Sequence, residues 1–509
     1  MASTDVASFI GQLSDIGIPF KTPTDPDWAT YSSTYNLRLP VTPAVVVVPS
    51  TVEHISNAIT FAGKHGFKVQ ARSGGHSYAS YSNGGVDGSI VIDLRKIHFR
   101  TISASDDPNC VIVGSGTRLG ELAQTIDQRT GWKRALPHGT CASVGVGGHF
   151  THGGYGFFSR AWGLAMDRIA KIMVVLANGQ LVLADENQNQ DLFYVSPNAL
   201  IAFSPLTSEL LLTLGLPNKA MRGAADSFGI AVAFYLNTVP TPESIIHWDF
   251  KVSDATKSIE SAVRAFQHIQ TFVHDHSVVD RQLGLNVTLS SDYFAVGGTF
   301  LGSRNDFVRK VIPALLEGIP EFPTIEVKQV DWATSLKLLN QGRELDSPTD
   351  SSEHSNFFAK SVTIPEPGFT AESLTDFFTY LLDQGARAPI SYFILADLYG
   401  GADSQINAKD QSFSAFAHRD TLWVTQLYGY VDNEQVFPSE GLDFINGLAS
   451  AMTARLPSYG AYSNYTDPSL PREEANDLYY GKELHKKLKQ LKRDLDPNNV
   501  FANPQSIEG

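Results

Sequence analysis

The chain has 509 residues, of which 42% are hydrophobic and 18% are charged, which is the composition of a globular protein with a large core. A chain of this length usually folds as two or three domains. The formal net charge of −14 predicts an acidic surface, which argues against nucleic acid or anionic membrane as the main partner. No apolar stretch of about 18 residues occurs, so no membrane span is expected.

The ends and the cysteines of the chain give weaker information. The opening sequence Met-Ala-Ser-Thr-Asp lacks a basic region and a long apolar run. We therefore expect a cytoplasmic protein as the sequence stands, and a secreted one if the native chain begins earlier. The two cysteines, Cys110 and Cys141, are too few for a secreted disulfide scaffold, although one disulfide or two unrelated thiols remain possible. The sequence leaves the oligomeric state open.

Short strands and helices alternate over residues 43–180, which predicts an α+β domain. The predicted helix at 51–65 begins at a capping residue, Ser50 or Thr51, and carries Glu53 in its first turn. Residues 119–128 form the second predicted helix. The predicted strands are Ala44–Val48, Phe67–Ala71, Ile90–Leu94 and Val111–Val113.

A different pattern covers residues 240–450, where longer amphipathic helices alternate with strands. Residues 258–273 have helical spacing, and residues 390–395 read as a strand. This region is a candidate second domain. The last 50 or so residues return to short motifs and end in Asn-Val-Phe-Ala-Asn-Pro at 499–504.

The first chemical motif, Arg72–Tyr78, follows a predicted strand and contains Gly74-Gly75-His76. Adjacent glycines let the backbone approach a ligand closely and present N–H groups to an anion such as a pyrophosphate. A glycine pair after a strand is most often only a turn. This motif therefore gains weight only from the second one.

The second motif is a glycine-rich region at 136–163 that contains Cys141. Seven glycines lie between positions 145 and 163, which is more bare backbone than a structural role requires. A large flat ligand that lies on main chain explains it better. His149 and His152 suggest a metal site, but no further Cys, Asp or Glu stands at a suitable spacing, so no metal is expected.

These motifs together resemble the berberine bridge enzyme-like branch of the vanillyl-alcohol oxidase family, and in particular its glucooligosaccharide oxidases. The resemblance covers nearly the whole chain and rests on Arg72–Tyr78, Cys141–His149, Arg222-Gly223 with Ser227–Ile230, Asn464–Pro468 and Asn499–Pro504. It implies an α+β, two-domain, PCMH-type FAD-binding fold. Residues 1–240 and 455–509 would form the FAD-binding domain, and residues 241–454 would form a substrate domain built on an antiparallel sheet.

The resemblance implies FAD held by two covalent bonds, from His76 to the 8α carbon of the isoalloxazine and from Cys141 to its carbon 6. The residue types suit this role, because imidazole and thiolate are nucleophiles that can attack an electron-poor ring. The alternatives are a histidine of the core and an inert thiol. The remaining expected FAD contacts are Arg72, Ser73, Gly74, Gly75, Ser77, Val144, Gly145, Gly147, Gly148, His149, Gly154, Gly229, Ile230, Asn464, Phe501 and Asn503.

The same resemblance implies that Tyr465 removes the hydroxyl proton of a small-molecule substrate. A free phenol has a pKa near about 10, so it needs help, and Asp397 stands where the family has an aspartate that accepts the proton or orients the hydroxyl. A turn former at a strand end is the alternative for Asp397. Tyr78 resembles a second active-site tyrosine or is a core residue. Val144 stands where the family controls access of O₂ to the flavin, so we expect O₂ to be reduced to H₂O₂.

The substrate is less well determined. In the oligosaccharide oxidases, aromatic and amide residues before the aspartate bind sugar rings, whereas here Leu395 stands where a polar amide would bind a hydroxyl. A site that lacks this group discriminates less well for sugars. A carbohydrate oxidase and an oxidase or oxidative cyclase of a specialised metabolite are therefore both open, as is an inactive or unstable flavin-binding protein.

The third possibility arises from residues 195–219. The family runs directly from the sequence found here at Asp191–Tyr194 into that found at Ala220–Gly223, and removal of the 25 residues 195–219 restores this pattern. Val195-Ser196 can be encoded by a splice-donor sequence, Leu212-Thr213 by a branch point, and Lys219 by a codon ending in AG. A surface loop is the alternative. We expect an unspliced intron.

Overall fold

The structure is a computed structural model that describes residues 3–129, 131–185, 220–252, 254–317, 319, 325–346 and 353–509. The predicted unspliced segment, residues 195–219, lies outside this part of the chain. Within the described ranges, no helix combines the length and the apolar character needed to cross a membrane.

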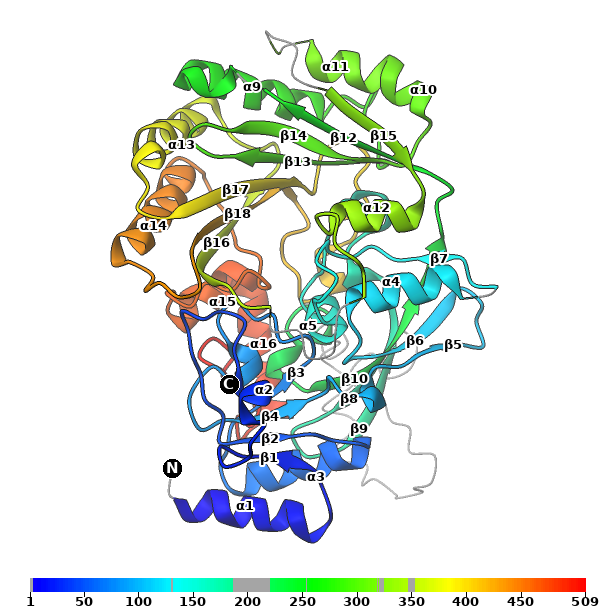
Figure 1. Cartoon of the computed structure of the whole chain (residues 1–509), viewed down its shortest axis with the longest axis vertical. Coiled ribbons are helices and arrows are strands. Elements are labelled where there is room, and N and C mark those ends of the chain that lie inside the picture. The colour runs from blue at the N-terminus through cyan, green and yellow to red at the C-terminus, as the bar shows by residue number, and fades with distance from the viewer. Residues whose placement is uncertain are drawn as a thin grey trace.

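The N-terminal half builds two sheets, which lie below the large sheet in the view of Figure 1. The first has the order β1-β2-β4-β3, with β2, β4 and β3 parallel, and comprises β1 (Phe20–Lys21), β2 (Val45–Val47), β3 (Val69–Arg72) and β4 (Ile90–Asp93). The second has the order β5-β6-β10-β8-β9 and comprises β5 (Ile102–Ala104), β6 (Cys110–Gly114), β8 (Ile169–Val175), β9 (Leu181–Asp185) and β10 (Ile230–Asn237). A short pair joins β7 (Arg134–Ala135) to β11 (Val239–Pro240).

The helices of this half are α1 (Ser3–Asp15), α2 (Trp28–Ser32), α3 (Val52–Lys64), α4 (Leu119–Gln128), α5 (Val146–Thr151) and α6 (Ser159–Trp162). Helix α4 has the predicted bounds, and α3 differs from its prediction by one residue at each end. The cap of α3 is Thr51, whose side chain accepts a hydrogen bond from the backbone N–H of His54. The four predicted strands are confirmed as β2, β3, β4 and β6, with ends shifted by one or two residues.

A seven-stranded antiparallel sheet dominates the second half of the described chain, in the order β15-β12-β14-β13-β17-β18-β16. Its strands are β12 (Ile245–Lys251), β13 (Leu283–Leu289), β14 (Phe294–Phe300), β15 (Ile325–Val330), β16 (Asn356–Pro365), β17 (Ser391–Leu398) and β18 (Thr421–Val431). The helices of this region are α9 (Ile259–Phe272), α10 (Arg304–Asp306), α11 (Ile312–Leu316), α12 (Trp332–Leu339), α13 (Ala371–Gln384) and α14 (Ser439–Thr453). The predicted helix and strand are confirmed as α9 and β17.

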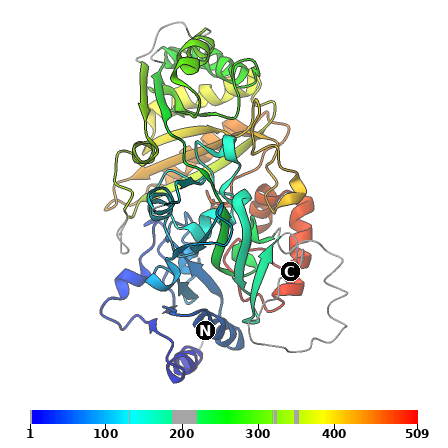
Figure 2. The ribbon, with the colours of Figure 1, turned by 90° about the vertical axis from the view of Figure 1, so that its right-hand side faces the viewer.

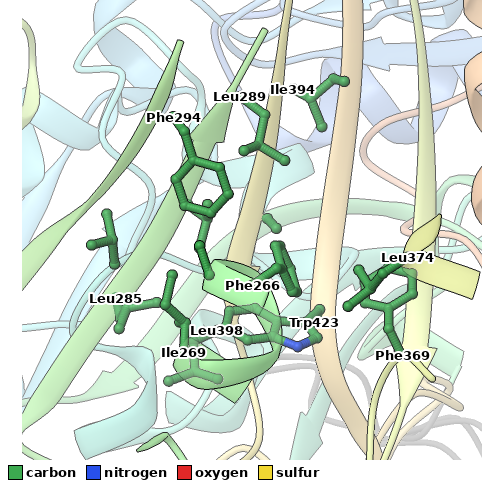
Figure 3. Packing of buried hydrophobic residues seen from close by; sticks show 14 of the residues in the cluster. Phe266, Ile269, Leu285, Leu289, Phe294, Phe369, Leu374, Ile394, Leu398 and Trp423 are labelled. Atoms are coloured by element: carbon green, nitrogen blue, oxygen red, sulfur yellow. The ribbon is translucent and has the colours of Figure 1, made fainter. Parts of the chain in front are cut away.

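One face of this sheet packs against α9, α13 and α14, and the opposite face is turned toward the N-terminal sheets (Figure 1). Phe266 and Ile269 of α9 meet Trp423 and Leu398 of the sheet in the apolar layer between them (Figure 3). Alternate residues of β17 follow this division, because Ile394 and Ala396 belong to that layer while their neighbours point the other way.

The C-terminal segment returns to the N-terminal half through α15 (Arg472–Tyr480) and α16 (Lys482–Leu495), seen beside the strands of that half in Figure 2. Leu488 and Leu491 share a core with residues of α4 and α5. The buried amine of Lys492 donates to the carbonyl oxygens of Ser227 and Phe501 and to the carboxylate of Asp496. We propose 1–240 with 455–509, and 241–454, as the two domains, since these boundaries fall between β11 and β12 and just after α14.

Candidate active site

A cavity of about 810 Å³ lies between the N-terminal half and the open face of the large sheet. That size is within the range of about 300–1,000 Å³ found for ligand and cofactor sites. Its walls come from both domains and from the C-terminal tail. The lining includes two glycine-rich loops, residues of strands β13, β17 and β18, and Phe501 and Asn503 of the C-terminal tail.

The two glycine-rich loops touch through their backbones. A Cβ on Gly145 would lie 2.0 Å from the backbone nitrogen of Gly74, and a Cβ on Gly74 would lie 2.3 Å from that of Gly145. Only glycine allows this approach. Ser73 then joins the loops further, because its hydroxyl accepts from the N–H of Gly147 at 3.1 Å and donates to the carbonyl of Ser115 at 2.5 Å. This contact brings the His76 loop and the Cys141 loop to the same wall of the cavity.

His76, Cys141 and Glu353 present an imidazole nitrogen, a thiol sulfur and a carboxylate oxygen that all lie within 4.8 Å of one another. Burial lowers the pKa of His76 to about 4, so its imidazole is neutral at physiological pH and keeps a lone pair for nucleophilic attack. The ring of Tyr35 lies 4.5 Å from that of His76. Both cysteines are free thiols, so the disulfide alternative is wrong. The three side chains could also hold a cation, using the same atoms.

His149 and His152, the pair considered for a metal, bind protein groups instead. The Nε2 of His149 accepts from the N–H of Gly139 at 3.0 Å, and burial lowers its pKa to about 3. The Nε2 of His152 lies 3.2 Å from Asp226 Oδ1, and Asp226 Oδ2 accepts from the side-chain amide of Asn503 at 2.9 Å. These contacts fix the loops and the C-terminal tail around the cavity.

Three side chains of the cavity lining, Asp397, Tyr155 and Tyr465, form a chain of hydrogen bonds. The hydroxyl of Tyr155 donates to Asp397 Oδ2 at 2.7 Å and lies 2.9 Å from the hydroxyl of Tyr465. Because Tyr155 gives its only proton to the carboxylate, Tyr465 is the donor in the second bond. The oxygen of Tyr465 therefore keeps its lone pairs for another hydroxyl. Asp397 does not contact Tyr465 directly; Tyr155 connects them.

Burial shifts the pKa values of this chain in one direction. It raises the pKa of Asp397 to about 6, although the hydrogen bond from Tyr155 lowers it in part. Burial also raises the pKa of Tyr465 and of Tyr155 well above that of a free phenol. Neither phenol is thus a proton acceptor in ionised form at neutral pH. The carboxylate is the proton acceptor of the group.

Tyr78 lies against this chain, with its ring stacked on that of Tyr465 at 5.4 Å between centroids. Its hydroxyl accepts from the side-chain amide of Gln426 at 2.6 Å. Tyr428 and Phe393 also line the cavity and stack on each other at 4.9 Å, and the buried ring of Phe357 supports Tyr428 from behind at 4.7 Å. This part of the cavity lining is thus mainly aromatic.

Strand β17 contributes alternate side chains to the cavity lining. Phe393, Leu395 and Asp397 line the cavity, as alternate residues of a strand should. Leu395 pairs with Gln426 of β18, and Asp397 pairs with Asn286 of β13. A polar side chain beside Leu395 is therefore that of Gln426, on the neighbouring strand β18.

Nearly all predicted site residues line this one cavity. Beside Tyr465, Asp397, Tyr78, His76 and Cys141, the lining includes Ser73, Gly74, Gly75, Ser77, Val144, Gly145, Gly147, Gly148, His149, Gly229, Ile230, Asn464, Phe501 and Asn503. Asn464 donates from its amide to the hydroxyl of Tyr462 at 2.9 Å. The motifs that lie far apart in the sequence meet here.

Two residues expected to contact the cofactor, Arg72 and Gly154, lie behind the wall instead. Arg72 is 1% exposed, and its guanidinium donates to the carbonyl of Tyr31 and the side chain of Asn83, so it supports the His76 loop from within. It is the last residue of β3, and its side chain points away from the cavity. Gly154 donates its N–H to the hydroxyl of Tyr462 at 2.9 Å, and a Cβ there would lie 2.6 Å from the carbonyl oxygen of His149.

Sequence reasoning missed five residues of the site: Tyr155, Ser143, Glu353, Asn286 and Gln426. A signal existed for Tyr155, which stands between glycines in the second motif, and for Ser143, which lies inside the Cys141 loop. Nothing local marks the other three. They enter the site through strand pairing or through the fold of the second domain.

The chain matches two family models, "FAD binding domain" over residues 43–185 and "Berberine and berberine like" over residues 461–508. It is 31% identical to a carbohydrate oxidase of Microdochium nivale over 503 residues, which covers 97% of this chain and 94% of the relative. It is 25% identical to a tetrahydroberberine oxidase of Berberis wilsoniae, over 91% of this chain and 85% of that one.

A solved structure of the glucooligosaccharide oxidase of Acremonium strictum, described as carrying 6-S-cysteinyl, 8α-N1-histidyl FAD, has a TM-score of 0.87 and 28% identity, with 98% of this chain and 99% of that chain covered. Similarity of this extent over both domains confirms the predicted α+β, two-domain fold. The chain therefore belongs to the PCMH-type, berberine bridge enzyme-like family of FAD-linked oxidoreductases, and fungal carbohydrate oxidases are among its relatives.

Proposed function

We propose that this FAD-linked oxidase oxidises the CH–OH carbon of an alcohol or hemiacetal, with FAD bonded to both His76 and Cys141 and with O₂ reduced to H₂O₂. The observation that carries the proposal is that the Tyr465–Tyr155–Asp397 chain and the two nucleophiles line the same cavity. A cavity of about 810 Å³ that is lined by both groups has the size of a ligand and cofactor site. FAD supplies the two-electron acceptor in this reaction.

Three features of the wall support a covalently held flavin. The loops that carry His76 and Cys141 touch at Gly74 and Gly145, and both loops line the same cavity. His76 is neutral and Cys141 is a free thiol, so both have the chemistry of a nucleophile. The Acremonium strictum relative, with the same fold, carries cysteinyl and histidyl bonds to its FAD. We infer the same two bonds here.

The proton of the substrate hydroxyl passes to Asp397 through the two tyrosines. Tyr465 accepts the substrate proton as its own proton moves to Tyr155, and Tyr155 passes its proton to the carboxylate of Asp397. No phenolate has to form, which agrees with the raised pKa values of both tyrosines. The substrate oxygen can then form a carbonyl as the carbon loses a hydride.

The substrate wall favours a molecule with an apolar or aromatic face. Leu395, Phe393 and Tyr428 line it, and Leu395 provides no hydrogen-bond donor for a sugar hydroxyl. Sugar rings also stack on aromatic side chains, so a carbohydrate oxidase, like the Microdochium nivale relative, stays the first candidate. An oxidase or oxidative cyclase of a specialised metabolite is the second, favoured by Leu395 and by the Berberis relative.

Oxygen as the acceptor is supported by Val144, which lines the cavity three residues after Cys141. Reduced enzyme should therefore react with O₂ faster than free reduced flavin does. A stopped-flow comparison in air-saturated buffer measures this directly. Equal rates would contradict an oxidase and favour another acceptor.

The test of the whole proposal uses the purified holoenzyme. Acid precipitation should leave the yellow colour in the pellet, and His76→Ala or Cys141→Ala should each leave one bond and a lower reduction potential. Oxygen consumption is then measured over a panel of oligosaccharides, aromatic alcohols and polyketide-like alcohols. Release of all FAD into the supernatant would disprove covalent attachment, and no oxygen uptake with any member would disprove the CH–OH reaction for these classes.

A further inference from the structure

We propose that Ser143 and Glu353 form a proton relay that activates Cys141 for its bond to the flavin. The relay would serve cofactor attachment and not substrate turnover. It rests on the bicovalent attachment proposed above. It assigns a role to a carboxylate that the oxidation reaction does not use.

The hydrogen-bond geometry gives the relay its direction. Ser143 is 2% exposed, and its hydroxyl donates to Glu353 Oε2 at 2.5 Å. The sulfur of Cys141 lies 3.2 Å from the same hydroxyl oxygen. A serine hydroxyl has one proton, and Ser143 gives it to the carboxylate, so its oxygen accepts the thiol proton. The S–H···O–H···carboxylate chain thus points from Cys141 to Glu353.

Attachment requires this proton to leave, because the thiolate and not the thiol is the nucleophile. The thiol proton moves to the oxygen of Ser143 as the hydroxyl proton of Ser143 moves to Glu353, and the sulfur lone pair forms the C–S bond. In the balanced reaction, one S–H bond and one ring C–H bond are replaced by one C–S bond. The two hydrogens and two electrons go to O₂, which becomes H₂O₂.

Among the groups near Cys141, Glu353 is the one that can accept the thiol proton. His76 lies within 4.8 Å of both Glu353 and Cys141, but its lone pair is needed for its own bond, and burial lowers its pKa to about 4. The other carboxylate oxygen of Glu353 lies 3.9 Å from the largely exposed guanidinium of Arg343. The titratable or charged groups that face Cys141 and Glu353 are His76, Tyr35, Arg118 and Arg343.

The experiment measures bond formation and not oxidation rate. Glu353→Gln and Ser143→Ala are purified as holoenzymes beside the wild type, digested, and analysed by mass spectrometry for flavin on the Cys141 and His76 peptides. Glu344→Gln is the matched control, because Glu344 is exposed and pairs with Lys337 on the same segment. Loss of a general base slows a step about 10²–10⁴-fold, so at neutral pH we expect the Cys141-bonded fraction to fall at least about tenfold in both relay variants, while the His76 bond remains.

A pH series separates a relay from a purely structural role. Hydroxide can remove a thiol proton directly, so aerobic incubation of the variants at alkaline pH should restore the Cys141 bond without the relay. If wild type and both variants have equal fractions of flavin-bonded Cys141, the relay is disproved and the bicovalent attachment is not. A loss of the Cys141 bond that alkaline pH does not restore would also disprove only the relay. A wild type with no Cys141 bond would disprove the bicovalent attachment itself.

Discussion

At the scale of single residues, Tyr155 changes the proton path that we propose for this enzyme. A tyrosine and an aspartate were expected to act as a pair, but the aspartate reaches Tyr465 only through the hydroxyl of Tyr155. Burial makes each phenol a poor acid, so a phenolate intermediate would be costly. A concerted transfer to Asp397 avoids it.

Tyr465→Phe should lose about 10²–10⁴-fold in kcat while it keeps covalent flavin, because only the proton-accepting oxygen is removed. Steady-state oxygen uptake measures the loss, and colour in the acid-precipitated pellet measures the flavin. Tyr430→Phe is the matched control, since Tyr430 is 40% exposed and lies outside the hydrogen-bond chain. A near-normal rate for Tyr465→Phe would place the base elsewhere.

The pH dependence of kcat/KM should report Asp397. Burial raises the pKa of its carboxyl to about 6, so the proton-accepting form is present above that pH and is lost as pH falls through it. We expect kcat/KM to decrease about tenfold per pH unit below that value. Asp397→Asn should lower the rate at pH 7 and remove this limb of the profile. A wild-type profile that stays flat down to pH 5 would contradict the assignment.

At the scale of elements, strand β17 carries both the proposed proton acceptor, Asp397, and the residue proposed to influence specificity, Leu395. Its alternation places Phe393, Leu395 and Asp397 in the cavity and their neighbours in the core against α9 and α13. A change at position 395 therefore alters the substrate wall without reaching the apolar core. The proton acceptor two residues along the same strand keeps its position.

Leu395→Gln should shift specificity toward oligosaccharides. The new amide adds a hydrogen-bond partner for a sugar hydroxyl, and one net hydrogen bond of about 0.5–1.5 kcal/mol corresponds to roughly a 2–12-fold change in kcat/KM. The measurement is the ratio of kcat/KM for an oligosaccharide to that for an aromatic alcohol, in the variant and in the wild type. Aromatic substrates serve as the internal control, and a ratio that does not rise would show that position 395 is not in contact with the substrate.

At the scale of the whole molecule, the site depends on the C-terminal segment, which packs against the N-terminal half of the chain. Helices α15 and α16 share a core with α4 and α5, and Lys492 fixes the tail that carries Phe501 and Asn503 into the cavity. Residues 220–230 also belong to this assembly. The N–H of Gly223 donates to the carbonyl of Thr151 at 2.8 Å, and Ala220 is fully buried.

A chain without residues 195–219 should give more soluble protein and more flavin per chain than the full sequence. Nine residues, 186–194, would then connect β9 to the buried segment that begins at Ala220, in agreement with the family pattern. Expression yield and the ratio of flavin to protein absorbance compare the two chains. Sequencing of the mature transcript is decisive: if it contains the segment, and its deletion abolishes activity, residues 195–219 are a true insertion.

The sequence by itself determined much of this protein, because many of its signals act between residues that are close together in the chain. Capping and apolar spacing predicted α3 and α4 to within a residue, because those signals act over one or two helical turns. The order of the glycine, histidine and cysteine motifs indicated the family and FAD. Each motif lies within a few residues, so no knowledge of the fold was needed.

Only the tertiary structure decided which side chains meet across long separations in the chain. Tyr155 and Asp397 are 242 positions apart, and Ser143 and Glu353 are 210 positions apart, so no local pattern could pair them. Arg72 shows the same limit within a motif. It stands at the end of a strand, and the direction of its side chain depends on the residues that pack against that strand. The sequence determined the family and its FAD cofactor, and the packing of the two halves of the chain decided which polar side chains meet in the cavity.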